Sequence, residues 1–304
     1  MKGDSAMKRL SAFSASALLM ALVLAPVPAW AHNMWVNAYD SFAHPPGHVL
    51  ASVGFGHRQP QDDLLTTDFG TIRLATYELA TPSGKRLALP MPDYTRHREP
   101  ADAGLFMERG DIGVTKVSFG PESEEGVYVL GAETVPTHVC KYVNTKGRQS
   151  AALKAMDEIG DVREIIFSVM YSGYAKSMFS YGTSGIPEPL GHDLEINPQV
   201  DVAALRPGDL LPVEVTFMGK PLSCEGTDLV YVTAVSDTYG GPDGYMLMAY
   251  VMDGKARIRI PTAGRWMLAV FTMRDVEKDP TLADLRGKVL EAGYQATLTL
   301  EVKP

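Results

Sequence analysis

The sequence predicts a protein made mostly of β-strands, arranged as two β-sandwich domains of the immunoglobulin or transthyretin kind with one or two short helices. Apolar and polar residues alternate with a period of two in many short segments, and clusters of turn-forming residues separate these segments. Short strands with regularly spaced turn signals are typical of β-sandwiches and barrels. No period of 20–50 residues repeats along the chain, which argues against a solenoid or propeller.

The first segment, residues 1–31, is predicted to be a signal peptide. Three basic residues precede an apolar run at residues 10–25, which is too short to span a bilayer. Two prolines end the run, and Ala29-x-Ala31 then provides the small residues that a signal peptidase recognises. Export through this signal would place the protein in the periplasm, and cleavage after Ala31 would leave His32 as its first residue. The alternative is an uncleaved membrane anchor.

The first domain is predicted to span residues 32–197 as a β-sandwich with a helical insertion. Residues 149–159 form the one convincing helical window, because their apolar side chains fall on one helical face. The clearest strands of this domain are at residues 49–55, 71–79 and 126–130.

The second domain is predicted to be a smaller β-sandwich at residues 198–304. The turn at residues 206–209 leads into a clean alternation of apolar and polar residues at 211–217. A second short helix is expected at residues 279–285, with Pro280 in its first turn. The remaining strands are expected at residues 229–235, 255–260, 266–272 and 294–302.

The charge of the chain excludes several partners. The 304 residues carry a net charge of −8, and residues 1–31 hold three basic and one acidic residue, so the mature chain has 25 basic and 35 acidic groups. A net charge of −10 argues against nucleic acid and against an anionic membrane surface as the main partner. Because no further apolar run approaches the length of a transmembrane helix, no membrane insertion of the mature chain is expected.

The two cysteines, Cys140 and Cys224, are predicted to form a disulfide in an oxidising compartment. The bond would close a long loop and stabilise the fold by roughly 4 kcal/mol in the chain-entropy model. Two free buried thiols are the main alternative, and a metal site is disfavoured because metal-binding cysteines are usually more closely spaced.

Common catalytic motifs are missing from the sequence. The segment Gly54-Phe55-Gly56 lacks the third glycine of a dinucleotide-binding loop, because Gln59 stands at that position. Phosphate-binding loops, zinc-protease helices and serine-hydrolase elbows are also lacking. We therefore do not predict an enzyme.

Histidines are the most useful candidates for a metal site. An N-terminal His32 would offer an amine and an imidazole from one residue. His57 follows a strand that ends in two glycines, and His44 and His48 flank a Pro-Pro-Gly turn. His192 lies near the predicted domain boundary beside acidic residues, where a purely structural role is the alternative.

Two further groups of residues are candidate ligands. The methionines of residues 245–252 could bind Cu(I), although methionine at strand spacing more often fills a core. Asp62, Asp63 and Asp68 could bind Ca²⁺, although an acidic solvated loop is the simpler interpretation.

Four segments resemble an exported bacterial family associated with nickel and cobalt uptake transporters. They are His32-x-x-Trp35, Gly56-His57, the segment at residues 191–198 and the segment at residues 208–222, and Ala263-Gly264-Arg265-Trp266 fits the C-terminal part. The resemblance covers nearly all of the mature chain. It implies a periplasmic metal-binding component that works beside an inner-membrane transporter, with ligand roles at His32, His57 and His192.

The leading functional hypothesis is therefore a periplasmic accessory protein that binds Ni²⁺, or Co²⁺, and passes it to an inner-membrane nickel or cobalt uptake transporter. The same nitrogen ligands bind Cu²⁺ more tightly, so ligand type alone does not identify the metal. A copper protein with an amine-and-two-imidazole brace is one alternative. A carbohydrate-binding or adhesive β-sandwich, in which the histidines are incidental, is the other.

Overall fold

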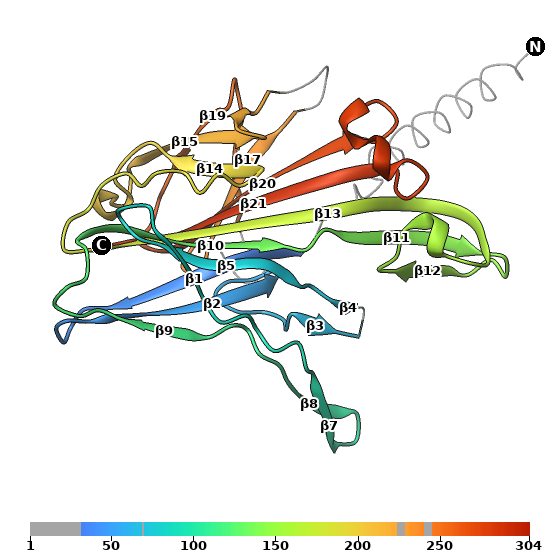
Figure 1. Cartoon of the computed structure of the whole chain (residues 1–304), viewed down its shortest axis with the longest axis horizontal. Coiled ribbons are helices and arrows are strands. Elements are labelled where there is room, and N and C mark those ends of the chain that lie inside the picture. Colours follow the sequence, from blue (N-terminus) through green and yellow to red (C-terminus); the bar gives the residue numbers. More distant parts are fainter. Residues whose placement is uncertain (1–31, 69, 224–228, 240–244) are drawn as a thin grey trace, which may run out of the picture. The chain divides into compact units, whose positions relative to one another are not determined.

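The computed structural model describes residues 32–304 except residue 69 and the segments 224–228 and 240–244 (Figure 1). The predicted signal peptide, residues 1–31, lies outside the described residues. Strands dominate the described chain, and its helices are three short 3₁₀ segments: η1 (Met156–Glu158), η2 (Val202–Ala204) and η3 (Pro280–Leu285). None of the helices in the described part is long and apolar enough to cross a membrane. The predicted all-β class is confirmed.

The centre of the molecule is a ten-stranded sheet, in which eight strands follow the order β18-β17-β20-β21-β13-β10-β5-β6. The other two strands extend the sheet beside β13: β11 pairs with β13, and β12 pairs with β11. All neighbouring strands are antiparallel except β13 and β21, which are parallel. The strands of this sheet are β5 (Leu74–Ala80), β6 (Arg86–Ala88), β10 (Gly126–Thr134), β11 (Thr137–Asn144), β12 (Gln149–Ala152), β13 (Val162–Tyr181), β17 (Tyr231–Ser236), β18 (Leu247–Tyr250), β20 (Gly264–Asp275) and β21 (Glu291–Val302).

Two smaller sheets cover opposite faces of the large sheet (Figure 1). One contains β1 (Asn33–Ser41), β2 (His48–Gly56) and β9 (Thr115–Ser118); the other contains β14 (Leu194–Pro198), β15 (Leu210–Phe217), β16 (Lys220–Pro221) and β19 (Lys255–Arg259). The remaining strands form two small ribbons, β3 (Thr66–Thr67) with β4 (Gly70–Thr71) and β7 (His97–Asp102) with β8 (Leu105–Arg109).

The long strand β13 separates two hydrophobic cores. Tyr174 and Met178 pack into the core under β14 and β15, whereas Ala175 and Phe179 pack into the core under β1 and β2. This division follows from strand geometry, because successive side chains point to opposite faces of a sheet.

The large sheet crosses the predicted domain boundary after residue 197. Strand β13, which precedes the boundary, pairs directly with β21, which follows it, and residues 32–304 form one compact unit. The division into domains at residues 32–197 and 198–304 stays a prediction.

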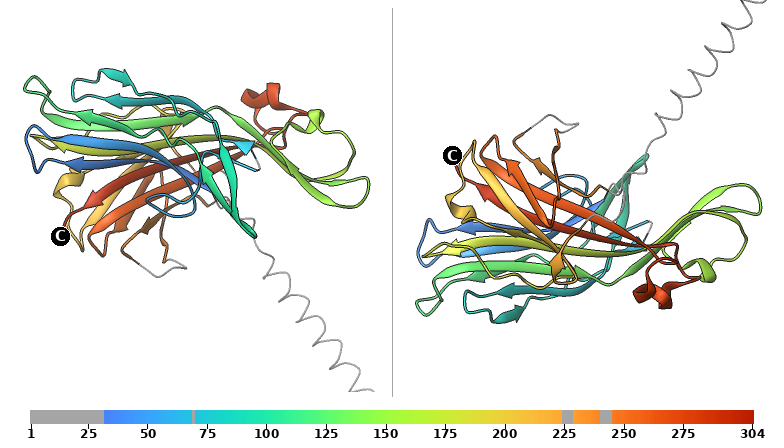
Figure 2. Two further views of the ribbon diagram at one scale, coloured as in Figure 1. Left: turned by 90° about the horizontal axis from the view of Figure 1, so that it is seen from below. Right: turned by 90° about the horizontal axis from the view of Figure 1, so that it is seen from above.

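The predicted helix at residues 149–159 is wrong. Residues Gln149–Ala152 form β12, which pairs with β11 along Cys140–Val143, and only Met156–Glu158 forms a single 3₁₀ turn. Figure 2 shows this hairpin and the adjoining part of β13 extending beyond the rest of the sheet. Pairing with β11 supplies the backbone hydrogen bonds that a helix would otherwise provide, so tertiary context overrides the helical pattern. The short helix expected at 279–285 is confirmed as η3, with the Asp279 side chain accepting the Thr281 N–H at 2.9 Å.

The predicted disulfide is not found. Cys140 is a fully buried free thiol on β11, flanked by β12 and β13, and its pKa is raised by burial. Its predicted partner, Cys224, lies outside the described residues.

A buried ion pair connects the large sheet to β14. Lys176 of β13 donates from Nζ to Glu195 Oε1 at 2.7 Å and to Asn197 Oδ1 at 2.6 Å, and both charged side chains are at most 3% exposed. Glu195 also accepts the backbone N–H groups of Leu190 and Gly191 at 2.7 and 2.9 Å. Burial opposes the ionisation of Glu195, but the Lys176 ammonium and these donors outweigh it and hold the pKa of Glu195 below its ordinary value.

We expect Lys176→Met to destabilise the protein by about 3–5 kcal/mol, because it leaves the Glu195 charge buried without its cation. Urea unfolding followed by tryptophan fluorescence measures the change. The control is Arg109→Met, which removes one partner of an exposed ion pair with Glu99 and should leave the unfolding midpoint unchanged. Equal effects of the two substitutions would contradict this role of the buried pair.

Candidate metal centre

The candidate site lies at the open end of the hairpin formed by β1 and β2. Asn33 pairs with Gly56 in the antiparallel register, so His32 and His57 are the next residues on each side. Their ring centroids are 4.3 Å apart at an interplanar angle of 51°. The His32 ring also stacks on Phe55 at 5.3 Å and 17°. The structure therefore brings together the two histidines that the sequence favoured most.

The loop after His57 folds back over the hairpin and fixes this end of the site. The Pro60 carbonyl accepts hydrogen bonds from Trp35 Nε1 at 3.1 Å and from Asn37 Nδ2 at 2.9 Å. Phe55 and Asp63 form a β-bridge, in which the Asp63 N–H donates to the Phe55 carbonyl at 3.0 Å. These contacts hold the acidic residues of the loop beside the histidines.

Asp62 orients His57. Asp62 Oδ2 accepts the His57 backbone N–H at 2.6 Å and lies 3.2 Å from His57 Nδ1. The backbone hydrogen bond from His57 is the main reason that the pKa of Asp62 is lowered. A proton on Nδ1 that is donated to this carboxylate leaves Nε2 as the free nitrogen donor, the usual arrangement of a metal-binding histidine and its carboxylate partner. The sequence alone indicates Asp62 only as a Ca²⁺ candidate, because the contact with His57 depends on the fold of the loop.

Gly56 permits the close approach of Asp62. Its φ is +121°, a conformation that other residues rarely adopt, and a Cβ atom there would lie 2.5 Å from Asp62 Oδ2. The glycine before His57 is thus required both by the backbone and by the packing of the carboxylate.

The electrostatic environment keeps His32 uncharged more readily than an ordinary histidine. Burial lowers the pKa of His32, His57 lowers it further, and Asp63 and Asp62 oppose the change. A neutral imidazole can donate its lone pair to a metal ion without first losing a proton.

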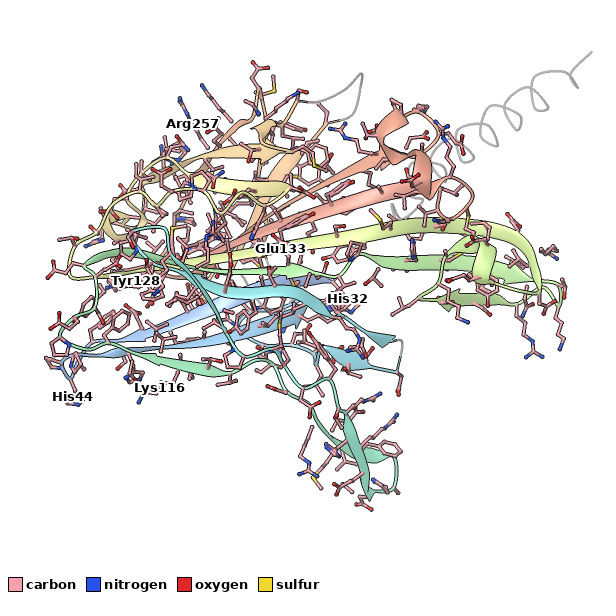
Figure 3. The ribbon with its side chains drawn as sticks, in the orientation of Figure 1. His32, His44, Lys116, Tyr128, Glu133 and Arg257 are labelled. Carbon is pink, nitrogen blue, oxygen red and sulfur yellow. The ribbon has the colours of Figure 1, made fainter. Side chains whose placement is uncertain are left out.

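His44 and His48 lie at the other end of the same hairpin. His48 pairs with Ser41, and His44 follows the end of β1 (Figure 3). Nine residue steps separate His48 from His57, a distance of roughly 30 Å at about 3.3 Å per residue. These two predicted ligands therefore do not join His32 and His57.

His192 is buried on the opposite face of the large sheet. Its ring lies 5.5 Å from that of Tyr174, a residue of the core under β14, and its Nε2 lies 3.7 Å from Glu133 Oε1. Burial lowers the pKa of His192 to about 4. The structure thus places His192 in a packed polar cluster at the base of β14, away from the other predicted ligands.

The described residues contain no ready-made metal site of three or more histidine, cysteine, aspartate or glutamate side chains. Asp68 is held by Arg96 and Arg98 at 2.7 and 3.0 Å, which matches an ion-pair role and not Ca²⁺ binding. The candidate centre therefore consists of two imidazoles, with Asp62 behind one of them. A third nitrogen ligand would have to come from the amine that cleavage after Ala31 creates on His32.

A family model described as a domain of unknown function, DUF4198, matches residues 29–274. The chain belongs to this family. The DUF4198 region includes His32, His57 and both strands of the hairpin that carries them. No curated protein matches the chain.

We expect Gly56→Ala to destabilise the protein by about 1–3 kcal/mol, because the substitution adds backbone strain and displaces Asp62. Thermal unfolding measures the cost, and the NMR shifts of the His57 ring report the displaced carboxylate. Gly84→Ala is the matched control, since Gly84 also has a positive φ, +82°, but nothing lies within 4 Å of the added Cβ. A smaller loss of stability in Gly56→Ala than in Gly84→Ala would contradict the packing argument.

Proposed function

We propose that this DUF4198 protein is a periplasmic metal-binding accessory protein, which takes up Ni²⁺, or Co²⁺, and delivers it to an inner-membrane uptake transporter. The observation that carries the proposal is the 4.3 Å separation of the His32 and His57 rings at one hairpin end. The link to nickel and cobalt transport comes from the sequence resemblance and is part of the proposal.

The residues fit a nitrogen-ligand site for a transition metal. His32 and His57 supply two imidazoles, and the Asp62 carboxylate next to His57 Nδ1 is the kind of outer partner that orients a metal-binding ring. An N-terminal amine on His32 would complete a chelate that suits the square-planar or tetragonal preference of Ni²⁺ and Cu²⁺. The metal is the cargo in this proposal and no catalytic step is assigned to it.

The accessibility of the two rings suits a protein that must release its metal. His57 is 51% exposed at its side chain, and His32 is also exposed. A closed structural metal site normally buries four ligands around the ion. Two imidazoles on an open hairpin end instead leave coordination positions that a partner's ligands can occupy during transfer.

We expect His32→Ala and His57→Ala each to weaken Ni²⁺ binding more than the roughly 10–100-fold loss that is typical of outer-sphere partners. Calorimetry on the processed protein measures the affinity, and mass spectrometry establishes whether His32 is its first residue. His44→Ala and His48→Ala are the matched controls and should bind as tightly as the parent protein. If the parent protein binds neither Ni²⁺, Co²⁺ nor Cu²⁺ more tightly than the millimolar range, the proposed function is wrong.

We expect the affinity for Ni²⁺ to fall steeply from about pH 8 to about pH 5, because protons compete for the same nitrogen atoms. An ordinary α-amine titrates near pH 7.7–8.0 and an ordinary histidine near 6.5, so the amine is protonated first as the pH falls. The lowered pKa of His32 moves its own loss of binding to lower pH. A binding curve that stays flat between about pH 8 and 5.5 would instead indicate carboxylate ligands, which are protonated mainly below about pH 5.

A further inference from the structure

The methionines of residues 245–252, expected to fill a core, lie on the surface. Met246, Met248 and Met252 are 54–66% exposed, and Tyr250 between them is 58% exposed. Only the alternate residues, such as Val251 at 1% exposure, point into the core. Exposed methionine and tyrosine side chains on one strand are typical of protein-binding surfaces.

The strand that carries these side chains has an unpaired edge. Strand β18 is the last strand of the large sheet in the described chain. The Val251 N–H donates to Val230 on the β17 side at 2.9 Å, so the alternating antiparallel ladder directs the backbone N–H and C=O of Tyr250 away from β17. These groups therefore face the free edge of the sheet.

Among the described strands β19 pairs only with β15, so its other edge is a second free edge beside the first. A tight turn at Asp253 and Gly254, both with positive φ, links β18 to β19, with reciprocal backbone hydrogen bonds between Met252 and Lys255 at 2.9 Å. Beyond this turn the two strands diverge into different sheets. They leave a groove of about 320 Å³ lined by Ala249, Tyr250, Met252, Lys255, Ala256 and Arg257.

The β19 side of the groove is basic. Lys255, Arg257 and Arg259 are the exposed residues of β19 and alternate with buried Ala256 and Ile258. Glu214 lies opposite Lys255 in the register, whereas Arg257 lies opposite Pro212. This row of cations contrasts with the net charge of −8 of the whole chain. Figure 3 places Arg257 on a different side of the molecule from His32.

We propose that this groove, between β18 and β19, binds an extended segment of a partner protein in which apolar and acidic side chains alternate. The segment would add as a strand to the free edge, with its backbone bonded to the outward groups of β18. Its apolar side chains would contact Tyr250 and Met252, and its carboxylates would face Arg257. A second copy of this chain is disfavoured as the occupant, because it would bring two rows of cations together. The groove is separate from the histidine pair, so the inference does not depend on metal binding.

The test uses a fluorescein-labelled peptide of alternating glutamate and valine, EVEVEVE, titrated with the processed protein at low ionic strength. We expect saturable binding that is at least about tenfold tighter than binding of the reversed-charge peptide KVKVKVK. Amide hydrogen exchange at Tyr250 and Arg257 should slow when the acidic peptide binds. Equal binding of the two peptides, or no slowing at Tyr250, would overturn the proposal.

Two substitutions test separately how the Arg257 charge and the backbone edge of β18 contribute to peptide binding. Arg257→Glu should weaken binding of the acidic peptide by at least about tenfold, whereas Lys116→Glu, the same charge reversal on exposed β9, should not. Tyr250→Pro removes an outward N–H but no ladder bond, and should weaken binding by a similar factor while circular dichroism stays unchanged. Unchanged binding of the acidic peptide to Arg257→Glu would overturn the proposal. Self-association of the parent protein in sedimentation, if Tyr250→Pro abolishes it, would also overturn the proposal.

Discussion

The burial of both faces of β13 from residue 168 to residue 179 is the constraint on which the rest of the structure depends. This strand of 20 residues contributes side chains to two cores and forms the boundary between them. A strand buried on both sides needs another layer on each face, since its side chains alternate between the faces. The β1-β2-β9 sheet and the β14-β15-β16-β19 sheet meet this requirement; the first carries the histidine pair, and the second contributes β19 to the groove beside β18.

Contacts with the large sheet fix the position of the histidine pair. Strand β1 is attached to β21 by polar contacts across the core: Gln295 Nε2 donates to Asn33 Oδ1 at 2.8 Å, and Thr297 Oγ1 donates to the Met34 carbonyl at 2.7 Å. Because these anchors lie one and two residues from His32, the end of the hairpin is held where the chain would otherwise fray. His32, which we propose as an N-terminal ligand, is thereby held beside His57.

Most strands, and the position of His57 just after a strand, could be predicted from local sequence pattern, whereas the ligand roles of His32 and His57 stay predictions. Alternation at 211–217 and 294–302 corresponds to β15 and β21, and the strand ending at Gly56 places His57 at the end of its hairpin. Local sequence pattern does not predict which distant segments pair with one another. Residues 149–152 form a strand and not a helix because they pair with β11. His192 lies across the large sheet because the start of β14 packs on β13, where Lys176 binds Glu195. The contact of Asp62 with His57 depends on the way the loop folds back over the hairpin, which the local sequence pattern does not indicate.

The net charge of a sequence also does not show where the charged residues lie on the folded surface. The net charge of the chain argues against an acidic partner, yet that argument averages over the whole surface. Strand β19 places Lys255, Arg257 and Arg259 on one side because alternate residues of a strand share a face, and the core takes Ala256 and Ile258 between them. At physiological ionic strength charges act over a Debye length of about 8 Å, so a partner at the groove meets these cations, with Glu214 and Asp253 near Lys255, and is screened from the carboxylates of the rest of the surface. The two proposed binding surfaces would therefore select ligands of opposite charge on one acidic protein.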